Sequence, residues 1–396
     1  MPDLLTILTG LSWPVALAIA WLAGEFGLRW TGLPRISFYG IIGFALASAQ
    51  LGVLPAPGSG PVLALADVAF GLILFELGYR INLRWLRANP WLGVAGLVEA
   101  SATFVAVYFV AVWFDTSVMT ALMLASLAMS TSPATVIRIV NEQRSSGQVS
   151  ERVLHLSALN CVLSVFAFNI IVGFWVFHSA DDIGDAAVNS LIALLASCAV
   201  GAVFGIAVPA LLRALGGMSH DATVAFALAV ILLVAITYTT LLSPVVAALA
   251  FGLTARYRRV AFSQAQRNFG PLGELLTVLL FVYAASTLDW RQAMAGGMLA
   301  LGVVGARLLA KTVGVTLFSH VSGISWRKGA LTGLALAPVS VFAILLLEHA
   351  AQRGVHVVDE LRAMAAVTML LEVFGPIIIQ RALVWAREAQ GVSRGT

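Results

Sequence analysis

Long runs of apolar residues separated by short polar segments occupy almost the whole chain. A helix needs about 20 predominantly apolar residues to cross a bilayer, so runs of this length predict membrane-spanning helices. The ninth run is short and follows the eighth almost directly, which leaves twelve spans as an alternative count. The thirteen runs extend approximately over residues 5–28, 36–55, 61–79, 91–114, 117–138, 153–177, 186–212, 222–241, 243–255, 270–287, 293–318, 329–349 and 362–386.

The composition supports an all-α polytopic membrane protein. Of the 396 residues, 60% are hydrophobic and 11% are charged, whereas soluble proteins are about 25% charged. So few charges cannot cover the surface of a protein of this size, which argues against a water-soluble enzyme. The net charge of +4 comes with scattered arginines and does not indicate nucleic-acid binding. Cys161 and Cys198 both lie in apolar runs, which argues against a disulfide framework.

Positively charged residues test the span count, because cytoplasmic loops carry the excess of Lys and Arg. With thirteen spans and the N-terminus outside, eighteen Lys and Arg fall in cytoplasmic segments, and three fall in outer loops. An even number of spans spoils this alternation. The first ten residues lack the positive region of a cleavable signal peptide. We therefore predict thirteen spans in a bacterial inner membrane, with the N-terminus outside and the C-terminus in the cytoplasm.

Two spans are interrupted by proline and small residues at comparable places. The fifth contains Pro133 within Ser130–Thr135, and the twelfth contains Pro338 within Gly333–Ser340. Proline frees a backbone carbonyl, and irregular backbone survives at membrane depth only where it lines a cavity or is buried in protein. If spans 1–6 and 8–13 form two halves, each break lies in the fifth span of its half, and the seventh span is a linker. This pattern favours an inverted-repeat transporter with a midplane site, although proline can also simply kink a helix.

Ionisable residues deep in the spans are candidates for function, because burying them in a membrane costs several kcal/mol. Arg307 lies near the middle of span 11, and Lys311 follows one turn later on the same face. Lys311 could extend to the membrane surface, whereas Arg307 needs a salt bridge, a substrate or the crossing helices as its partner. The carboxylates within the spans are Glu76, Glu99, Glu274 and Glu372.

The carboxylates differ in their expected partners. Glu372 lies near mid-membrane without a local partner, which makes it a candidate mate for Arg307. Glu76 can pair with Arg80 at i, i+4, and Glu99 either lines a cytoplasmic vestibule or bonds neighbouring helices. No acid occurs in a metal-binding or catalytic spacing, and no glycine-rich phosphate loop is present. We therefore expect neither an enzyme nor a cofactor nor a resident metal.

Five segments, in chain order, resemble those of cation:proton antiporters of the sodium/hydrogen exchanger type. Ile36–Pro55 resembles the second helix of that family, and Phe75–Arg87 (FELGYRINLRWLR) resembles the end of its "F-x-x-G-L-E-L" helix. Ser126–Val140 (SLAMSTSPATVIRIV) and Gly329–Leu347 resemble its two unwound helices. Leu241–Ala255 (LLSPVVAALAFGLTA) resembles its "S-P-x-x-G-A-F-x-A-G" run. The resemblance covers nearly the whole chain.

The resemblance implies a homodimer in which a core domain moves as an elevator against a dimerisation domain. Residues 91–180 and 291–387 would form the core, and residues 1–90 and 218–290 the dimerisation scaffold. Residues 181–217 would be the linker helix and 388–396 a short cytoplasmic tail. The broken helices would cross at the ion site, where cation and proton compete for one aspartate in the sixth span.

The sequence departs from this family at that aspartate. Within Ser157–Ser164 (SALNCVLS), Asn160 keeps its place and Cys161 stands where the aspartate is expected. A thiol is a poor ligand for hard cations. No Asp occurs between Asp115 and Asp181, so a shifted alignment does not restore the carboxylate.

Three functions follow from these residues. The first is antiport of a monovalent cation and protons, with the ion at Thr131, Ser132, Thr135, Asn160, Cys161 and Ser340. A displaced carboxylate, which is Glu372, Glu99 or Glu76, would then supply the charge. The second is transport of an anionic or neutral solute, because Arg307 and Lys311 remain and half-helix N-termini favour anions. The third is a sensor or scaffold without transport.

Overall fold

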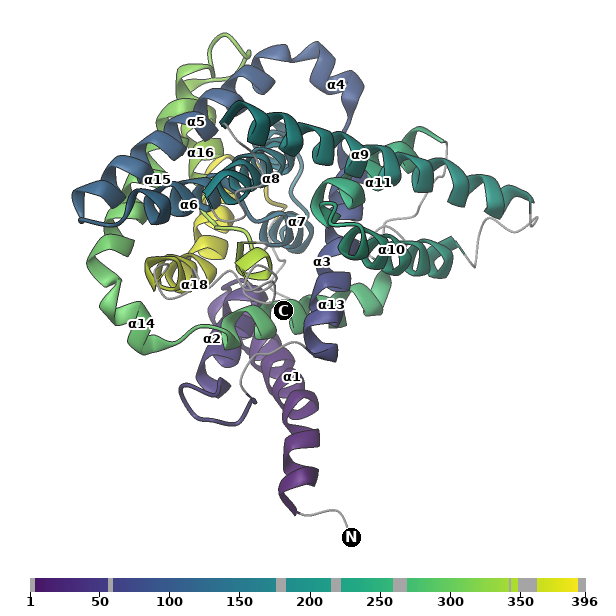
Figure 1. The fold of residues 1–396 in the computed structure, drawn as a ribbon, viewed down its shortest axis with the longest axis vertical. Helices are drawn as coiled ribbons and strands as arrows, with labels where there is room; N and C mark the ends of the chain where they lie inside the picture. The colour runs from purple at the N-terminus through teal and green to yellow at the C-terminus, as the bar shows by residue number, and fades with distance from the viewer. Residues whose placement is uncertain are drawn as a thin grey trace.

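The computed structural model describes residues 4–55, 60–175, 183–214, 222–258, 269–341, 343–347 and 362–390, and these residues contain helices and no strand (Figure 1). The helices, in chain order, are α1 (Leu4–Thr31), α2 (Arg35–Leu46), α3 (Pro61–Arg80), α4 (Leu83–Ala88), α5 (Pro90–Trp113), α6 (Val118–Met129), α7 (Pro133–Glu142), α8 (Gln148–Trp175), α9 (Ile183–Ala214), α10 (Ala222–Thr239), α11 (Pro244–Tyr257), α13 (Gly270–Ser286), α14 (Trp290–Ala295), α15 (Gly297–Leu317), α16 (Trp326–Ala335) and α18 (Arg362–Trp385).

The helices confirm an all-α membrane protein. Within the described residues, nine helical segments are long and apolar enough to cross a membrane, and α6 and α7 count together as one of them. Three shorter apolar helices, α2, α11 and α13, accompany them. The prediction of one continuous helix over 36–55 was wrong: α2 ends at Leu46, and the chain then turns through Gly52 at a φ of +69°. The count of thirteen spans, the inverted repeat and the orientation of the termini stay predictions.

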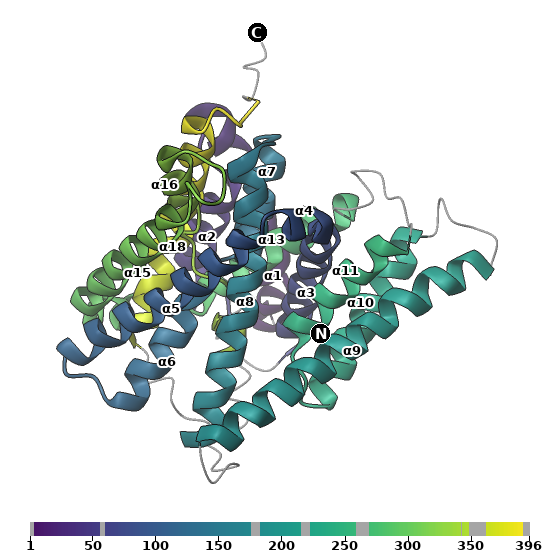
Figure 2. The same ribbon diagram turned by 90° about the horizontal axis from the view of Figure 1, so that it is seen from above.

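The helices pack in two groups, which Figures 1 and 2 show on either side of the molecule. In one group α5, α6, α14, α15, α16 and α18 pack on one another, with α8 against α6 and α16. In the other, α3 packs on α10, α11 and α13, while α2 packs on α1 and α13, and α9 packs on α11. Helix α7 packs on α8 and α18 of the first group. Its contacts with α3, together with those of α8 with α9 and of α2 with α18, join the two groups. The division into core, scaffold and linker domains remains a prediction.

Glycines allow three helices of the scaffold group to approach closely. A Cβ atom on Gly78 of α3 would lie 2.2 Å from the Leu249 carbonyl oxygen of α11, and one on Gly252 would lie 2.1 Å from the Phe75 oxygen. A Cβ on Gly201 of α9 would lie 2.1 Å from the Ala247 oxygen of α11. Membrane helices gain most of their association energy from such close packing.

Replacing Gly252 with Ala will therefore destabilise the scaffold. The added methyl group overlaps the α3 backbone, and overpacking of this kind costs about 1–3 kcal/mol. A thermal unfolding curve of the purified protein in detergent should show the loss as a lower midpoint. Gly305→Ala in α15 is the matched control, since nothing lies within 4 Å of a Cβ there. Equal midpoints for the two variants would mean that the α3–α11 contact is loose.

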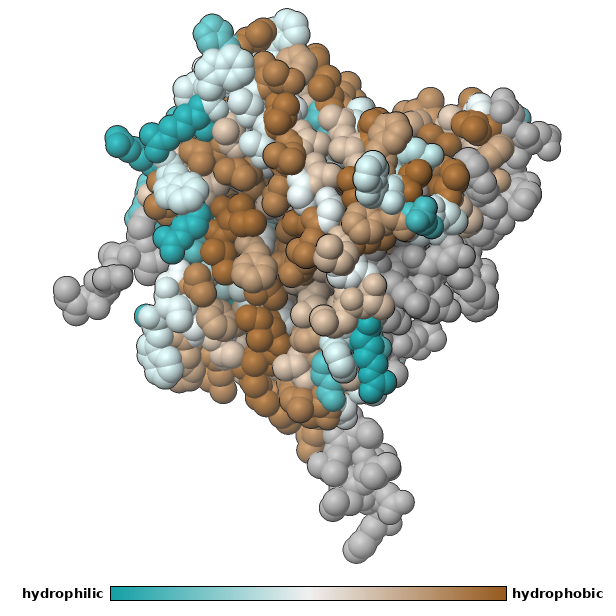
Figure 3. Space-filling view, turned by 90° about the vertical axis from the view of Figure 1, so that its left-hand side faces the viewer, coloured by the Kyte–Doolittle hydropathy of each residue, from teal (hydrophilic) through white to brown (hydrophobic). Residues whose placement is uncertain are grey.

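The outer face is apolar, as a lipid-facing surface requires. Figure 3 shows hydrophobic residues across the middle of one face and hydrophilic residues in small groups toward its edges. Large apolar side chains of α5, α9 and α15 are more than half exposed, among them Phe109, Leu195 and Leu309. Soluble proteins rarely expose so large an apolar area.

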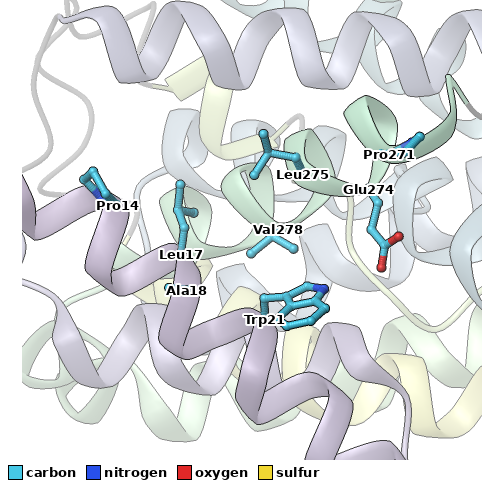
Figure 4. Close-up of a pocket in the computed structure, with 8 residues that line it drawn as sticks. All are labelled: Pro14, Leu17, Ala18, Trp21, Pro271, Glu274, Leu275 and Val278. Atoms are coloured by element: carbon cyan, nitrogen blue, oxygen red, sulfur yellow. The ribbon is translucent and has the colours of Figure 1, made fainter.

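A groove of about 650 Å³ separates α1 from α13 on the scaffold group (Figure 4). Its walls are mostly apolar, with Leu17 and Trp21 on one side and Leu275 and Val278 on the other. Glu274, also at this groove, is 46% exposed and lies 3.7 Å from Arg35. Solvent therefore reaches the Glu274 carboxylate.

Candidate functional site

The first break separates α6 from α7. Helix α6 ends at Met129, Ser130 and Ser132 are extended, and α7 begins with Pro133 at its first position. Proline suits that position because its missing N–H is not needed there. The Ser132 hydroxyl accepts hydrogen bonds from the Thr135 amide at 3.3 Å and the Thr135 hydroxyl at 2.9 Å. Of the two residues predicted as ion ligands, Ser132 thus caps α7, and Thr135 in its first turn donates to that cap.

The second break follows α16, which ends at Ala335. Residues 336–341 include Pro338 and Ser340 and are not part of an α-helix, and a helical segment resumes at 343–347. The two breaks bond each other directly. The Ser132 amide donates to the Pro338 oxygen at 3.1 Å, and the Thr131 hydroxyl donates to the Leu336 oxygen at 3.3 Å.

Arg307 of α15 holds the crossing together. Its guanidinium donates to Ala128 and Ser130 carbonyls of the first break, at 2.9 and 2.7 Å. It also donates to three carbonyls of the second break: Leu336 at 3.2 Å, Pro338 at 3.1 Å, and Ala337. Its side chain is fully buried. Of the roles predicted for Arg307, the structure therefore supports that of a lock on the crossing helices.

Lys311, one turn along α15, forms a buried salt bridge with Glu99 of α5. The Lys311 ammonium lies 3.1 Å from Glu99 Oε2, and both side chains are fully buried. The same ammonium donates to the Met129 carbonyl at 2.9 Å, at the end of α6. The expectation that Lys311 could extend to the membrane surface was wrong. Of the two roles open for Glu99, the structure selects bonding between helices.

Asn160 and Cys161 of α8 complete this cluster. The Asn160 amide nitrogen donates to Glu99 Oε1 and, at 3.1 Å, to the Thr131 hydroxyl. The Asn160 carbonyl oxygen Oδ1 is buried and has no hydrogen-bond partner among the described residues. The Cys161 thiol donates to the Thr131 carbonyl at 3.3 Å and hydrogen-bonds the Ser340 side chain. The structure thus brings together Glu99, Thr131, Asn160, Cys161 and Lys311.

The remaining predicted carboxylates lie outside this cluster. Glu76 of α3 pairs with Arg80 at 2.9 Å, as the i, i+4 spacing predicts, and accepts a hydrogen bond from Asn141 of α7 at 3.2 Å. Glu372 makes no ion pair or hydrogen bond with Arg307, whose donors all serve backbone carbonyls. The expected Arg307–Glu372 pair was therefore wrong, because the carbonyls freed by both breaks satisfy the guanidinium.

The Glu99–Lys311 ion pair is the part of the site that sequence reasoning missed. Both residues stood out as deep charges, but they are 212 positions apart and nothing in the sequence relates the faces of their helices. The one indication in the sequence was the charge count. Two basic residues were expected near the crossing, and burying them without an acidic residue nearby is unfavourable.

A polar cavity of about 220 Å³ lies between α2, α7 and α13. It is lined by side chains of both helix groups, including Arg35 and Tyr39 of α2, Arg138 and Glu142 of α7, and Glu274 of α13. It therefore places water-accessible space beside α7, whose first turn belongs to the crossing. No group of three or more His, Cys, Asp or Glu in the part of the chain that the structure describes could hold a metal ion.

Comparison with known proteins gives one family and one fold. The family model "Sodium/hydrogen exchanger, transmembrane" matches residues 15–385. A structure of the sodium proton antiporter MjNhaP1 from Methanocaldococcus jannaschii at pH 8 superposes with a TM-score of 0.69 at 16% identity, covering 96% of this chain and 97% of that one. An electron-microscopy map of the same antiporter gives a TM-score of 0.74 at 15% identity, covering 98% and 97%. No curated protein sequence matches the chain.

Proposed function

Because the chain belongs to the sodium/hydrogen exchanger family, we propose that it exchanges a monovalent cation, Na⁺ or K⁺, for protons across the membrane. In this proposal Glu99 of α5 takes the part of the missing aspartate in α8. The observation that carries it is the buried cluster at the crossing: the Glu99 carboxylate touches both Lys311 and Asn160, and Asn160 Oδ1 has no partner among the described residues.

The oxygen atoms of this cluster suit an alkali cation. Hard cations prefer carboxylate, carbonyl and hydroxyl oxygens, and Glu99, Asn160 and Thr131 offer one of each within a hydrogen-bonded group. A buried acceptor without a partner is rare in folded proteins and points to a bound ion or water. Cys161 would not be a ligand; its thiol stabilises the freed Thr131 carbonyl.

Charge balance then couples the cation to a proton. The Glu99–Lys311 pair is neutral as it stands, and a cation that binds the carboxylate has to take the place of the ammonium. A bare positive charge left in a dry site costs several kcal/mol, so Lys311 would release its proton as the cation enters. Rebinding of that proton would expel the cation. Arg307 keeps its charge in both states, because five carbonyl contacts hold it.

Movement of the core group against the scaffold group would expose the cluster alternately to each side. Support for such an elevator comes from the polar cavity between α2, α7 and α13, which lies between helices of the two groups. Homodimerisation through the scaffold group is part of the same proposal.

Proton flux in proteoliposomes tests the function. Vesicles with a trapped pH dye should show proton movement when a Na⁺, K⁺ or Li⁺ gradient is applied, and none with choline as the only cation. The dye signal should persist when the membrane potential is clamped. This control excludes passive proton leakage that merely balances the charge carried by the cation. A flat signal under all three gradients would contradict cation/proton exchange.

Substitutions of Cys161 test whether Glu99 supplies the charge. Cys161→Ser should keep exchange within about threefold, since a hydroxyl can still donate to the Thr131 carbonyl. Cys161→Asp would place a second anion in the cluster, and we expect slower exchange because like charges in a dry site repel. The idea fails if the wild type is inactive and Cys161→Asp creates exchange, since the family aspartate would then be indispensable.

Transport of an anionic solute is the second candidate, and one observation favours it. The buried charges of the crossing, Glu99, Lys311 and Arg307, sum to +1. Against this candidate, the Arg307 and Lys311 side chains are already bonded to protein oxygens. Counterflow of a radiolabelled organic anion in the same vesicles, without any response to alkali cations, would decide for this candidate. If neither assay gives a signal, the remaining candidate is a sensor or scaffold that does not transport.

A further inference from the structure

Glu372 of α18 is a buried carboxyl group that the proposed exchange does not use. Its side chain lies near the middle of α18 and the residue is 8% exposed. Neither carboxyl oxygen has a hydrogen-bond partner among the described residues. Thr368, one turn earlier on the same face, is 3% exposed, and its hydroxyl is also unpartnered there. Buried polar groups in folded proteins nearly always have a hydrogen-bond partner. We therefore infer that this face of α18 binds a ligand.

The position of Glu372 is at the boundary between the two helix groups. A Cβ on Gly40 of α2 would lie 3.3 Å from Glu372 Cγ, so the carboxyl group packs directly against the scaffold. The neighbouring Val373 carbonyl accepts a hydrogen bond from the Ser37 hydroxyl of α2 at 2.9 Å. Three residues later on α18, a Cβ on Gly375 would lie 2.9 Å from Pro338 at the second break. Helix α18 thus joins the scaffold to the crossing.

Charged groups on the surrounding helices are engaged elsewhere. The helices packed against α18 are α2, α7, α14, α15 and α16. Their bases bond other acceptors: Arg35 the Glu25 carboxylate, Arg138 the Gly273 carbonyl, Arg307 the crossing, Lys311 the Glu99 carboxylate, Arg327 the Trp385 carbonyl and Lys328 the Glu388 carboxylate. Arg291 lies over the Trp290 ring, and neither Tyr39 nor Glu142 donates a hydrogen bond to Glu372. No described counter-charge therefore balances an ionised Glu372.

We propose that Glu372 is a second proton-binding site, separate from the Glu99 cluster, and that its occupancy controls the contact between α2 and α18. An unbalanced carboxylate is unfavourable in a dry helix contact, whereas the neutral acid is tolerated. Glu372 carries its proton while α2 and α18 are in contact. The ionised Glu372 carboxylate is favoured in a second state, in which α18 has separated from Gly40 and water reaches the carboxylate. Since the proton binds the two states differently, protonation shifts their populations.

Labelling with dicyclohexylcarbodiimide tests the proton site without any transport. This apolar reagent adds across the O–H of a protonated, membrane-buried carboxyl group and leaves a stable adduct that peptide mass spectrometry locates. Glu372 should be labelled at pH 6, with labelling decreasing about tenfold per pH unit above its titration midpoint, as the neutral fraction does. The partly exposed Glu274 is the internal control and should be labelled far less. Absence of an adduct on Glu372 at every pH would overturn the site.

Hydrogen exchange tests the conformational part. Glu372→Gln imitates the protonated group, so at pH 9 peptides of α2 and α18 should exchange more slowly in this variant than in the wild type. Asp115→Asn, which changes an exposed carboxylate in the turn after α5, should leave these peptides unchanged. Equal exchange in wild type and Glu372→Gln would overturn the control of the α2–α18 contact. These measurements succeed or fail whether or not the protein exchanges cations, so they are independent of the proposed function.

Discussion

Replacing Glu99 with Gln will abolish cation-coupled proton movement and will destabilise the fold. The amide cannot balance the Lys311 ammonium, which is fully buried and has only the Met129 carbonyl as another acceptor among the described residues. Removing one partner of a buried ion pair costs about 3–5 kcal/mol. The proteoliposome dye assay measures the first effect, and thermal unfolding in detergent measures the second.

A double variant separates the two effects. In Glu99→Gln combined with Lys311→Met neither residue leaves a buried charge without its partner, and exchanging a buried ion pair for uncharged residues is often neutral for stability. We therefore expect the unfolding midpoint to recover while proton movement stays absent. Recovery of both would show that the pair is structural and that another group carries the proton. Glu76→Gln is the matched control, because Glu76 lies outside the crossing and pairs with Arg80.

Replacing Arg307 with Met will destabilise the protein more than Glu99→Gln or Gly252→Ala does. This guanidinium donates to five backbone carbonyls of the two breaks. The Pro338 and Leu336 oxygens keep a second donor in the Ser132 amide and the Thr131 hydroxyl, so three acceptors, those of Ala128, Ser130 and Ala337, lose the donor described here. A buried acceptor left without a donor costs about 1–3 kcal/mol. For three such acceptors the sum should be about 5 kcal/mol or more, and breaking a buried hydrogen-bond network is one of the few changes that cost so much. Thermal unfolding in detergent measures this loss as a lower midpoint.

Two further substitutions sharpen this result. Arg307→Lys keeps the charge but offers three donors from one point, so it should restore only part of the midpoint lost in Arg307→Met. Arg84→Met on α4 changes an exposed arginine and should leave the stability within about 0.5 kcal/mol of wild type. If Arg307→Lys unfolds at the same midpoint as the wild type, the positive charge alone stabilises the crossing and the five guanidinium hydrogen bonds are not required.

Much of the fold follows from the periodicity and length of the apolar runs. Each of the thirteen predicted runs contains a described helix, because a chain in lipid has to satisfy its backbone internally and the helix does so within one segment. The failure occurs in the second run, where the chain turns after Leu46. The run that begins at 329 leaves the helix at Leu336, within the interruption that the sequence predicts. Apolar composition alone does not distinguish a buried turn from a buried helix.

The site was predicted in part. Pro133 and Pro338 marked the crossing, since proline cannot continue either helix, and Asn160 was among the polar residues expected there. The pairing of charges was not predictable. Arg307 bonds carbonyls and not Glu372, because the breaks that proline creates supply acceptors close at hand, whereas Glu372 lies at the contact with α2.

The sequence by itself determined that this is a helical membrane protein, that two of its spans are broken, and that a cysteine stands beside Asn160 where an aspartate is expected. Those properties are local: they depend on the solvent around a segment and on the backbone chemistry of single residues. Only the tertiary structure decided which charges meet. Glu99 reaches Lys311 and Asn160 because α5, α15 and α8 bring residues far apart in sequence to one dry crossing. Charge pairing in such a place is set by distance and desolvation, and neither can be read along the chain.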